Sequence, residues 1–211
     1  MLVQRITYFP ALGKTTEVLA LLRERVVTDR AHGRTSTLIA EHLNAARGPS
    51  YCVDTELQDL AAYQAFHEER AADEAAQSFE ATITSMLAAP PDDRLFRVPI
   101  PVPATPAVQA PYYTHSAWFY PQPGLEFVVQ QLVDERVRFF IHEGESAAMW
   151  SGSYGNGGAV FVLLHHYQRL ADFDAFRAEA GPDTVGALFT ARLARVVRLP
   201  QETRLSETLL H

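Results

Sequence analysis

"QRLADFDAF", residues 168–176, nearly repeats "QDLAAYQAF", residues 58–66. Five of the nine positions are identical, and Phe173 in the later stretch stands where the earlier one has Tyr63. The offset in numbering between the two stretches is 168 − 58 = 110. Such a recurrence indicates that one folding unit occurs twice in this chain of 211 residues.

Two further matches keep the same order and nearly the same offset. "YFP" ending at Pro10 corresponds to "FYP" ending at Pro121, and "ERV" at 24–26 corresponds to "ERV" at 135–137. The offset is 111 in both cases (121 − 10 and 135 − 24). Chance similarity would not preserve the order of the matches along the chain. We therefore predict a tandem repeat of one unit.

A last match has a smaller offset. "RLFRV" at 94–98 resembles "RLARV" at 192–196, and the offset is 192 − 94 = 98. We expect this segment to be the last strand of each copy. The second copy would then have lost about a dozen residues (110 − 98 = 12) just before that strand.

Apolar periodicity predicts the same order of elements in both copies. In the first copy we expect strands at 2–9, 35–43, 50–57 and 94–98, and helices at 14–31 and at 59–88 without interruption. In the second copy we expect strands at 112–120, 146–154, 158–167 and 192–196, with helices at 125–141 and from Leu170 onward. Two short signals modify the second copy: "GNGG" at 155–158 indicates a hairpin turn, and "AGPD" at 180–183 should interrupt its second helix.

The order βαββαβ is that of a ferredoxin-like unit, whose helices cover one face of its sheet and leave the other face in need of a partner. Residues 99–111, "PIPVPATPAVQAP", hold five of the 13 prolines and suit an extended linker. We therefore predict an α+β protein in which two tandem ferredoxin-like units form an intrachain pseudo-dimeric α+β barrel. The expected boundaries are 1–98 for the first repeat, 99–111 for the linker and 112–211 for the second repeat.

Composition excludes several classes of partner. The formal net charge is −7 and Lys14 is the only lysine, so we expect no nucleic-acid partner. The longest strongly apolar run, residues 159–164, is too short to span a bilayer, and the N-terminus lacks the pattern of a signal peptide, so we expect no membrane partner. The single cysteine, Cys52, cannot form an intrachain disulfide. A soluble, cytoplasmic protein is the expectation.

Two histidines of the second copy are candidate catalytic residues. His115 lies near the start of the first strand and His165 near the end of the third, and these strands are antiparallel neighbours in a ferredoxin-like sheet. Both side chains are expected on the face beneath the helices, where the first copy has Gln4 and Thr55. We predict an acid/base pair here. The alternatives are half-exposed histidines without a function, or a metal site completed by a third ligand; we predict no metal.

Large aromatic residues gather on the first two strands of the second copy. We predict that Tyr113 and Trp150, with His142 at the end of the preceding helix, bind a planar ligand in an apolar pocket, although simple core filling explains the aromatic residues equally well. The break at 180–183 would open this pocket. The uninterrupted helix at 59–88 would close its counterpart, so we expect no equal pocket in the first copy.

The segments "YFPALGK", "FYPQPGL" and "HHYQRLADFDAF" resemble the NIPSNAP-like branch of the dimeric α+β barrel (ferredoxin-like) superfamily, as a tandem-repeat member. The resemblance covers both halves of the chain and implies the barrel fold. Members of that superfamily include cofactor-independent oxygenases, haem-binding enzymes and proteins without known activity. The fold therefore does not determine the function.

We expect a protein that binds a small apolar or aromatic ligand in its second repeat. The alternatives are a cofactor-independent oxygenase or isomerase with a histidine acid/base, a non-catalytic assembly protein, and a haem protein with an axial histidine. No cofactor is predicted. A small-molecule ligand and a second copy of the chain, in a homodimer, are the expected partners.

Overall fold

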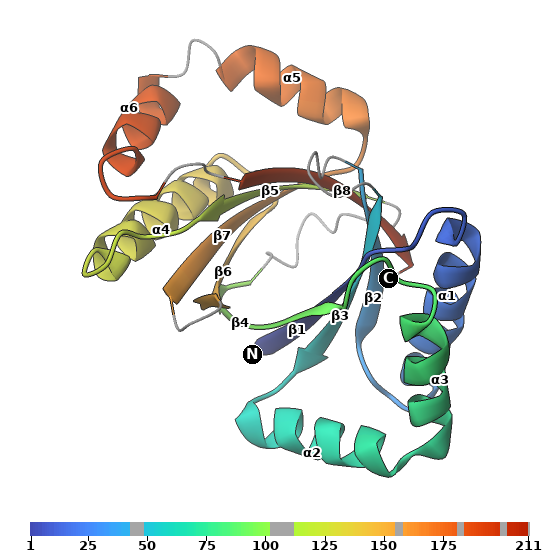
Figure 1. Ribbon diagram of the computed structural model, residues 1–211. Coiled ribbons are helices and arrows are strands. Elements are labelled where there is room, and N and C mark those ends of the chain that lie inside the picture. Colours follow the sequence, from blue (N-terminus) through green and yellow to red (C-terminus); the bar gives the residue numbers. More distant parts are fainter. Residues whose placement is uncertain (43–48, 102–111, 155–157, 181–183, 199–201, 211) are drawn as a thin grey trace. The chain divides into compact units, whose positions relative to one another are not determined.

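A computed structural model describes residues 1–42, 49–101, 112–154, 158–180, 184–198 and 202–210 (Figure 1). Most of the predicted linker, the predicted hairpin turn at 155–158 and the predicted helix break at 180–183 lie outside these residues. None of the described helices combines the length and the apolar character of a membrane-spanning helix. The chain divides into two compact units, which are described separately below: unit 1 is Met1–Phe96 with Thr208–His211, and unit 2 is Arg97–Glu207.

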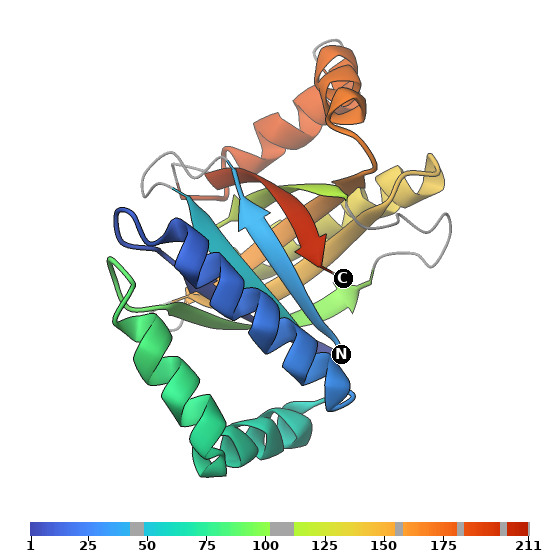
Figure 2. The ribbon, with the colours of Figure 1, turned by 90° about the vertical axis from the view of Figure 1, so that its right-hand side faces the viewer.

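Unit 1 follows the predicted order, with one additional helix. Its elements are β1 (Leu2–Tyr8), α1 (Thr15–Ala31), β2 (Ser36–Glu41), β3 (Ser50–Leu57), α2 (Leu60–Ala72), α3 (Glu74–Thr84) and β4 (Asp92–Ile100), whose last residues belong to unit 2. Strand β3 pairs antiparallel with both β1 and β2. Figure 2 shows α1 lying across these strands.

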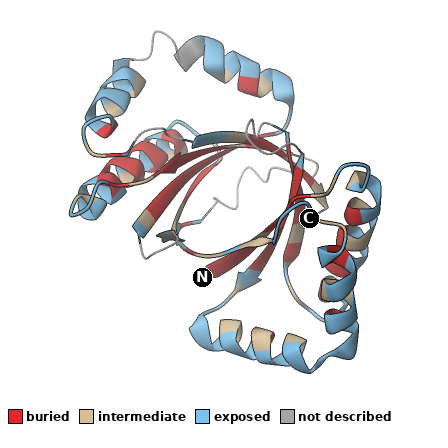
Figure 3. Cartoon of the chain, viewed as in Figure 1, coloured by how far each residue is buried: buried red, intermediate tan, exposed pale blue. Residues whose placement is uncertain are grey.

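Helix α1 shows why the chain folds in this way. Val18, Leu22 and Val26 recur every four positions and are fully buried against the sheet, whereas the other side of the helix faces solvent (Figure 3). Gly13 precedes the helix and Gly33 follows it, both with a positive φ that other residues rarely adopt. These two glycines determine where the helix begins and ends.

Unit 2 repeats the arrangement. Its elements are β5 (Tyr113–Phe119), α4 (Glu126–His142), β6 (Ala147–Tyr154), β7 (Gly158–Tyr167), α5 (Leu170–Ala180), α6 (Thr184–Leu193) and β8 (Glu202–Leu210), whose last residues belong to unit 1. Strand β7 pairs antiparallel with β5 and β6, and β5 also pairs with β8. Gly124 and Gly144, both with positive φ, flank α4 as Gly13 and Gly33 flank α1.

The predicted last strand of the second copy is wrong. Residues 192–196 form the end of α6 and the turn after it, and the last strand is β8, at Glu202–Leu210. The offset between the starts of β4 and β8 is 202 − 92 = 110, so the predicted loss before the last strand has not occurred. "RLARV" misled because its apolar Leu and Val fit a strand and a helix end equally well. Its Leu193 is buried as part of a helix.

The predicted uninterrupted helix at 59–88 is also wrong. The chain breaks at Asp73, whose backbone is extended (φ −90°, ψ 111°) and whose side chain accepts a hydrogen bond from the Ala75 backbone N–H at the start of α3. Aspartate is a favoured N-cap, and it can begin a new helix without any proline. Both units therefore carry two helices after their third strand.

The predicted fold class, an α+β protein of two ferredoxin-like units in a pseudo-dimeric α+β barrel, is confirmed. The bounds of most elements were also predicted closely. The second helical segments begin at Leu60 and Leu170 as expected, and β7 ends at Tyr167.

Candidate functional site

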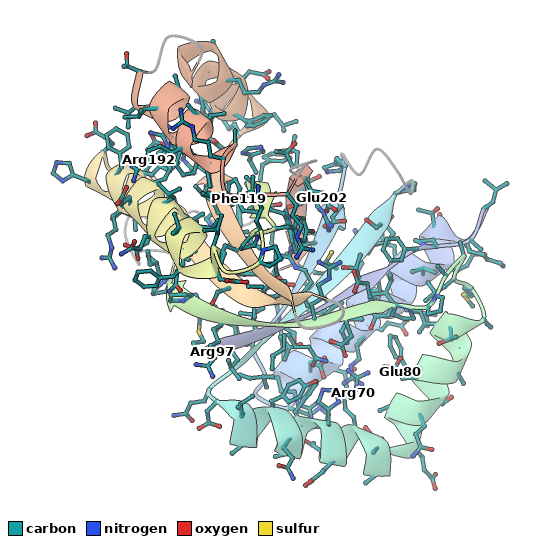
Figure 4. The ribbon with its side chains drawn as sticks, turned by 60° about the vertical axis from the view of Figure 1, so that its left-hand side comes forward. Arg70, Glu80, Arg97, Phe119, Arg192 and Glu202 are labelled. Carbon is teal, nitrogen blue, oxygen red and sulfur yellow. The ribbon has the colours of Figure 1, made fainter. Side chains whose placement is uncertain are left out.

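Unit 2 contains a cavity of about 630 Å³ between its sheet and the helices α4, α5 and α6. Its walls are largely apolar, with aromatic rings from four elements: Phe119, Phe140, Phe176 and Phe189. Figure 4 labels Phe119, which lies at the end of β5. Such a mainly apolar cavity with a few polar groups is typical of a small-molecule site.

The sequence-predicted pair His115 and His165 lines this cavity. The two residues are direct partners across β5 and β7. Directly opposed residues of an antiparallel pair project their side chains on the same face of the sheet, with Cβ atoms roughly 5 Å apart. The strand register therefore brings both imidazoles to the cavity.

His115 is the less tightly held of the two. Its ring packs against Phe173, with 5.3 Å between the ring centroids, and it has no hydrogen-bond partner among the described residues. Burial lowers the pKa of His115 to about 4, with smaller contributions from the charges of His165 and Arg177. At neutral pH this imidazole is uncharged, and its ring nitrogens can serve a ligand.

His165 is fixed from both sides. Its Nε2 lies 2.5 Å from the carboxylate of Glu145, and its Nδ1 lies 2.9 Å from the hydroxyl of Tyr167. The side chain is 3% exposed and stacks at 4.7 Å on the ring of Phe140. Because both ring nitrogens of His165 have partners, its side chain is fixed in the wall of the cavity. His115 is therefore the imidazole of this pair that can act as a base.

Tyr167 is the buried end of the chain of contacts Tyr167–His165–Glu145, and Glu145 is the end that reaches solvent. Burial raises the pKa of Tyr167, and the charge of Glu145 raises it further. The tyrosine hydroxyl therefore keeps its proton at neutral pH. The Glu145 side chain is 37% exposed, so the chain of hydrogen bonds leads from the buried ring of His165 to solvent.

A buried arginine adds a positive charge to the wall. The guanidinium of Arg136 lies 4.3 Å from the ring centroid of Phe140, a cation–π geometry. Its counterpart in unit 1 (136 − 111 = 25) is Arg25, which forms an ion pair with Asp29. Phe140 occupies the position that corresponds to Asp29 (140 − 111 = 29), so the side chain one helical turn after the arginine is aromatic in unit 2 and acidic in unit 1.

The other predicted site residues lie elsewhere. Tyr113, His142 and Trp150 are not among the residues that line the cavity; His142 is exposed, and Tyr113 and Trp150 are half-buried. Their ligand-binding roles stay predictions. Trp150 lies next to Met149, which belongs to the core beneath the helices, and neighbouring residues of a strand face opposite sides of the sheet.

Sequence reasoning missed Glu145. It comes directly after the glycine that ends α4, in a position where unit 1 has Arg34, and no local motif marks it. Tyr167, the other hydrogen-bond partner of His165, was not among the predicted site residues either. Among the described residues, no group of three or more His, Cys, Asp or Glu side chains is arranged to hold a metal ion.

The expectation that unit 1 has no equal cavity is wrong. A cavity of about 560 Å³ lies there at the corresponding place, under α2 and α3. The helix break at Asp73 explains it, since neither unit has the continuous helix that would close the space. The two cavities differ in chemistry rather than in size.

Comparisons with known proteins place the fold. No protein-family profile matches the chain, and no curated protein matches its sequence. Among the solved structures that match over nearly the whole chain are three with TM-scores above 0.65. A "putative monooxygenase" from Fusobacterium nucleatum has a TM-score of 0.73 and 11% identity, covering 99% of this chain and 92% of its own. A "putative monooxygenase" from Lactobacillus acidophilus has a TM-score of 0.68 and 11% identity, covering 98% of this chain and 93% of its own.

The third match is an "anthrone oxidase-like protein", with a TM-score of 0.66 and 13% identity, covering 99% of this chain and 91% of its own. At such identities the likeness shows the fold alone. These structures are dimeric α+β barrel proteins, so the resemblance predicted from the sequence is confirmed at the level of that fold.

Proposed function

We propose that unit 2 binds a small, largely apolar aromatic ligand in its cavity, and that His115 accepts a proton or a hydrogen bond from it. One observation carries this proposal: an uncharged imidazole without a partner among the described residues lines an apolar cavity of about 630 Å³. A buried polar group normally has a hydrogen-bond partner, and a ligand hydroxyl or acidic C–H would supply one.

A cofactor-independent oxygenase is the enzyme that this site would suit. His115 would remove a proton from a phenol or from a carbon beside a carbonyl, and the electron pair left on a ligand carbon would form a C–O bond to dioxygen. The resulting hydroperoxide would take the proton back from His115 and lose water as its O–O bond breaks, which leaves a carbonyl group. The names of the three similar structures favour this direction, although each name describes only its own protein. His165, held by Glu145 and Tyr167, would keep the cavity wall in place.

Thermal shift and calorimetry with anthrone and 1,4-naphthoquinone test the binding proposal, and dioxygen consumption with anthrone tests the oxygenase. A ligand that binds only the native state raises the melting temperature. We expect anthrone to do so in the wild type and in the control His32→Gln, an exposed histidine of unit 1, but at least about ten-fold less tightly in His115→Gln, which corresponds to about 1.4 kcal/mol.

If neither aromatic compound binds, the ligand proposal fails. If anthrone binds without dioxygen consumption, the binding role stands and the oxygenase is excluded for this compound. Equal affinities of the wild type and His115→Gln would remove His115 from the site.

We also propose that the chain is a tandem duplication of the NIPSNAP-like type, with repeats at 1–98 and 112–211. The bounds of the elements support a duplication. The offset between the starts of α1 and α4 is 126 − 15 = 111, and that between the starts of α3 and α6 is 184 − 74 = 110. One residue is therefore lost between these points in the second copy. Separate expression of residues 1–98 and 112–211 tests these boundaries.

A further inference from the structure

The cavity of unit 1 has a polar wall. Helix α2 contributes His67 and Arg70, helix α3 contributes Glu80, and the strands β1 and β4 contribute Ile6 and Asp93. Figure 4 shows Arg70 and Glu80 reaching from these two helices toward each other. The volume of about 560 Å³ is sufficient for a small organic molecule.

Corresponding positions explain the difference from unit 2. At the offset of 110, Gln77 and Glu80 of unit 1 stand where unit 2 has Ala187 and Thr190. The same part of the fold therefore lines an apolar cavity in one unit and a charged one in the other.

A buried glutamine holds two of the lining side chains. Gln4 is 1% exposed and lies on β1, on the same face as Ile6, which itself lines the cavity. Its Nε2 donates to both carboxylate oxygens of Asp93, at 2.8 and 2.9 Å, and lies 3.2 Å from Nε2 of His67. Its Oε1 is buried without a hydrogen-bond partner among the described residues. Packing alone would not require a buried amide here, because such a group is costly unless its atoms are paired.

The contact with Gln4 determines the state of His67. An amide N–H that points at Nε2 makes this ring nitrogen an acceptor, so the proton of the neutral ring is on Nδ1. The orientation of the amide is assigned from this network, because Oε1 in the same place would face the carboxylate of Asp93. The ring of Tyr63 contacts the imidazole edge-on at 4.4 Å and restricts its rotation.

The charges of the wall do not balance. Arg70 and Glu80 form an ion pair and cancel each other. Asp93 is solvent-exposed, and among the described residues its carboxylate receives only the amide of Gln4. With His67 counted as uncharged, the formal charges of the described lining sum to −1 (one cation, two anions), which favours a ligand with a positively charged group.

We propose that the unit 1 cavity binds a small polar molecule that carries one ammonium group, with the ammonium beside Asp93. The site does not depend on the function proposed for unit 2. Gln4 acts as the positioning residue, because it orients Asp93 and His67 from behind. The Arg70–Glu80 pair meets the polar remainder of the ligand.

Three probes with the same length and different charge test this site: 4-aminobutan-1-ol, butane-1,4-diol and 4-hydroxybutanoate. Binding to the full chain is followed by amide chemical shifts in NMR titrations. We expect 4-aminobutan-1-ol to shift the amides of residues around His67 and Asp93, and to bind at least about ten-fold more tightly than either other probe.

Asp93→Asn should abolish this preference, because it removes the charge and keeps the size of the side chain. The control Glu24→Gln makes the same charge change at an exposed position of α1, outside the cavity, and should leave binding intact. His115→Gln should also leave it intact, which separates the two sites. The proposal is overturned if no probe shifts these amides, if the three probes bind equally, or if Asp93→Asn binds 4-aminobutan-1-ol as the wild type does.

Discussion

Replacing His115 by glutamine, the residue at the corresponding position of unit 1, should change how stability depends on pH. In the folded protein the pKa of His115 is lowered to about 4, because burial disfavours the charged imidazole. The unfolded chain takes up this proton near the ordinary value of about 6.5. As pH falls from about 7 to 4, protons therefore bind to the unfolded state first, and the free energy of unfolding decreases.

The magnitude follows from the two pKa values. The difference between about 6.5 and about 4 corresponds to about 3 kcal/mol, which we reduce to about 2–3 kcal/mol because His115 is only partly buried. In His115→Gln this loss should be absent, whereas losses due to carboxylates are common to both proteins and cancel in the difference. Urea unfolding at several pH values between 4 and 7 measures it. Parallel curves for the two proteins would refute the assigned burial of this imidazole.

Three further outcomes are expected. Asp54→Ala should cost about 3–5 kcal/mol in urea unfolding, because Asp54 makes two 2.7 Å hydrogen bonds to the buried guanidinium of Arg5; a cost below about 1 kcal/mol would contradict this. Tyr167→Phe should cost about 1–3 kcal/mol by leaving Nδ1 of His165 buried without the hydroxyl, and an unchanged stability would show that the bond is not formed in solution. Burial raises the pKa of Cys52, so a thiol reagent should label it only on unfolding; rapid labelling of the native protein would refute its burial.

The fold could be predicted because its signals are local and occur twice. The glycines at 13 and 124 and the matching helix starts at Leu60 and Leu170 mark the same boundaries in both units. One error, the uninterrupted helix at 59–88, arose where a single residue changes the local structure. Asp73 ends one helix by capping the next one. A single aspartate does not stand out in the surrounding sequence, which is rich in Ala and Glu.

The candidate site could be predicted only in part. The pairing of His115 with His165 follows from strand register. Side chains alternate between the two faces of a strand, and this alternation is enough to predict which residues of two neighbouring strands share a face. Glu145 lies in a turn between α4 and β6, and turns have no such periodicity. Its contact with His165 depends on the path of the chain after Gly144, which no pattern in the sequence specifies.

The shared strand register has a consequence for how this protein can acquire or lose chemistry. Gln4 pairs with Thr55 as His115 pairs with His165, but only the two histidines line the cavity of their unit, whereas Gln4 acts on its cavity through Asp93 and His67. The residues at these two positions can be exchanged without disturbing the glycines and the apolar core that hold the rest of each unit. An exchange between the units would need no insertion or strand slippage. One unit can therefore vary its chemistry while the other keeps its own, and selection can act on each cavity separately.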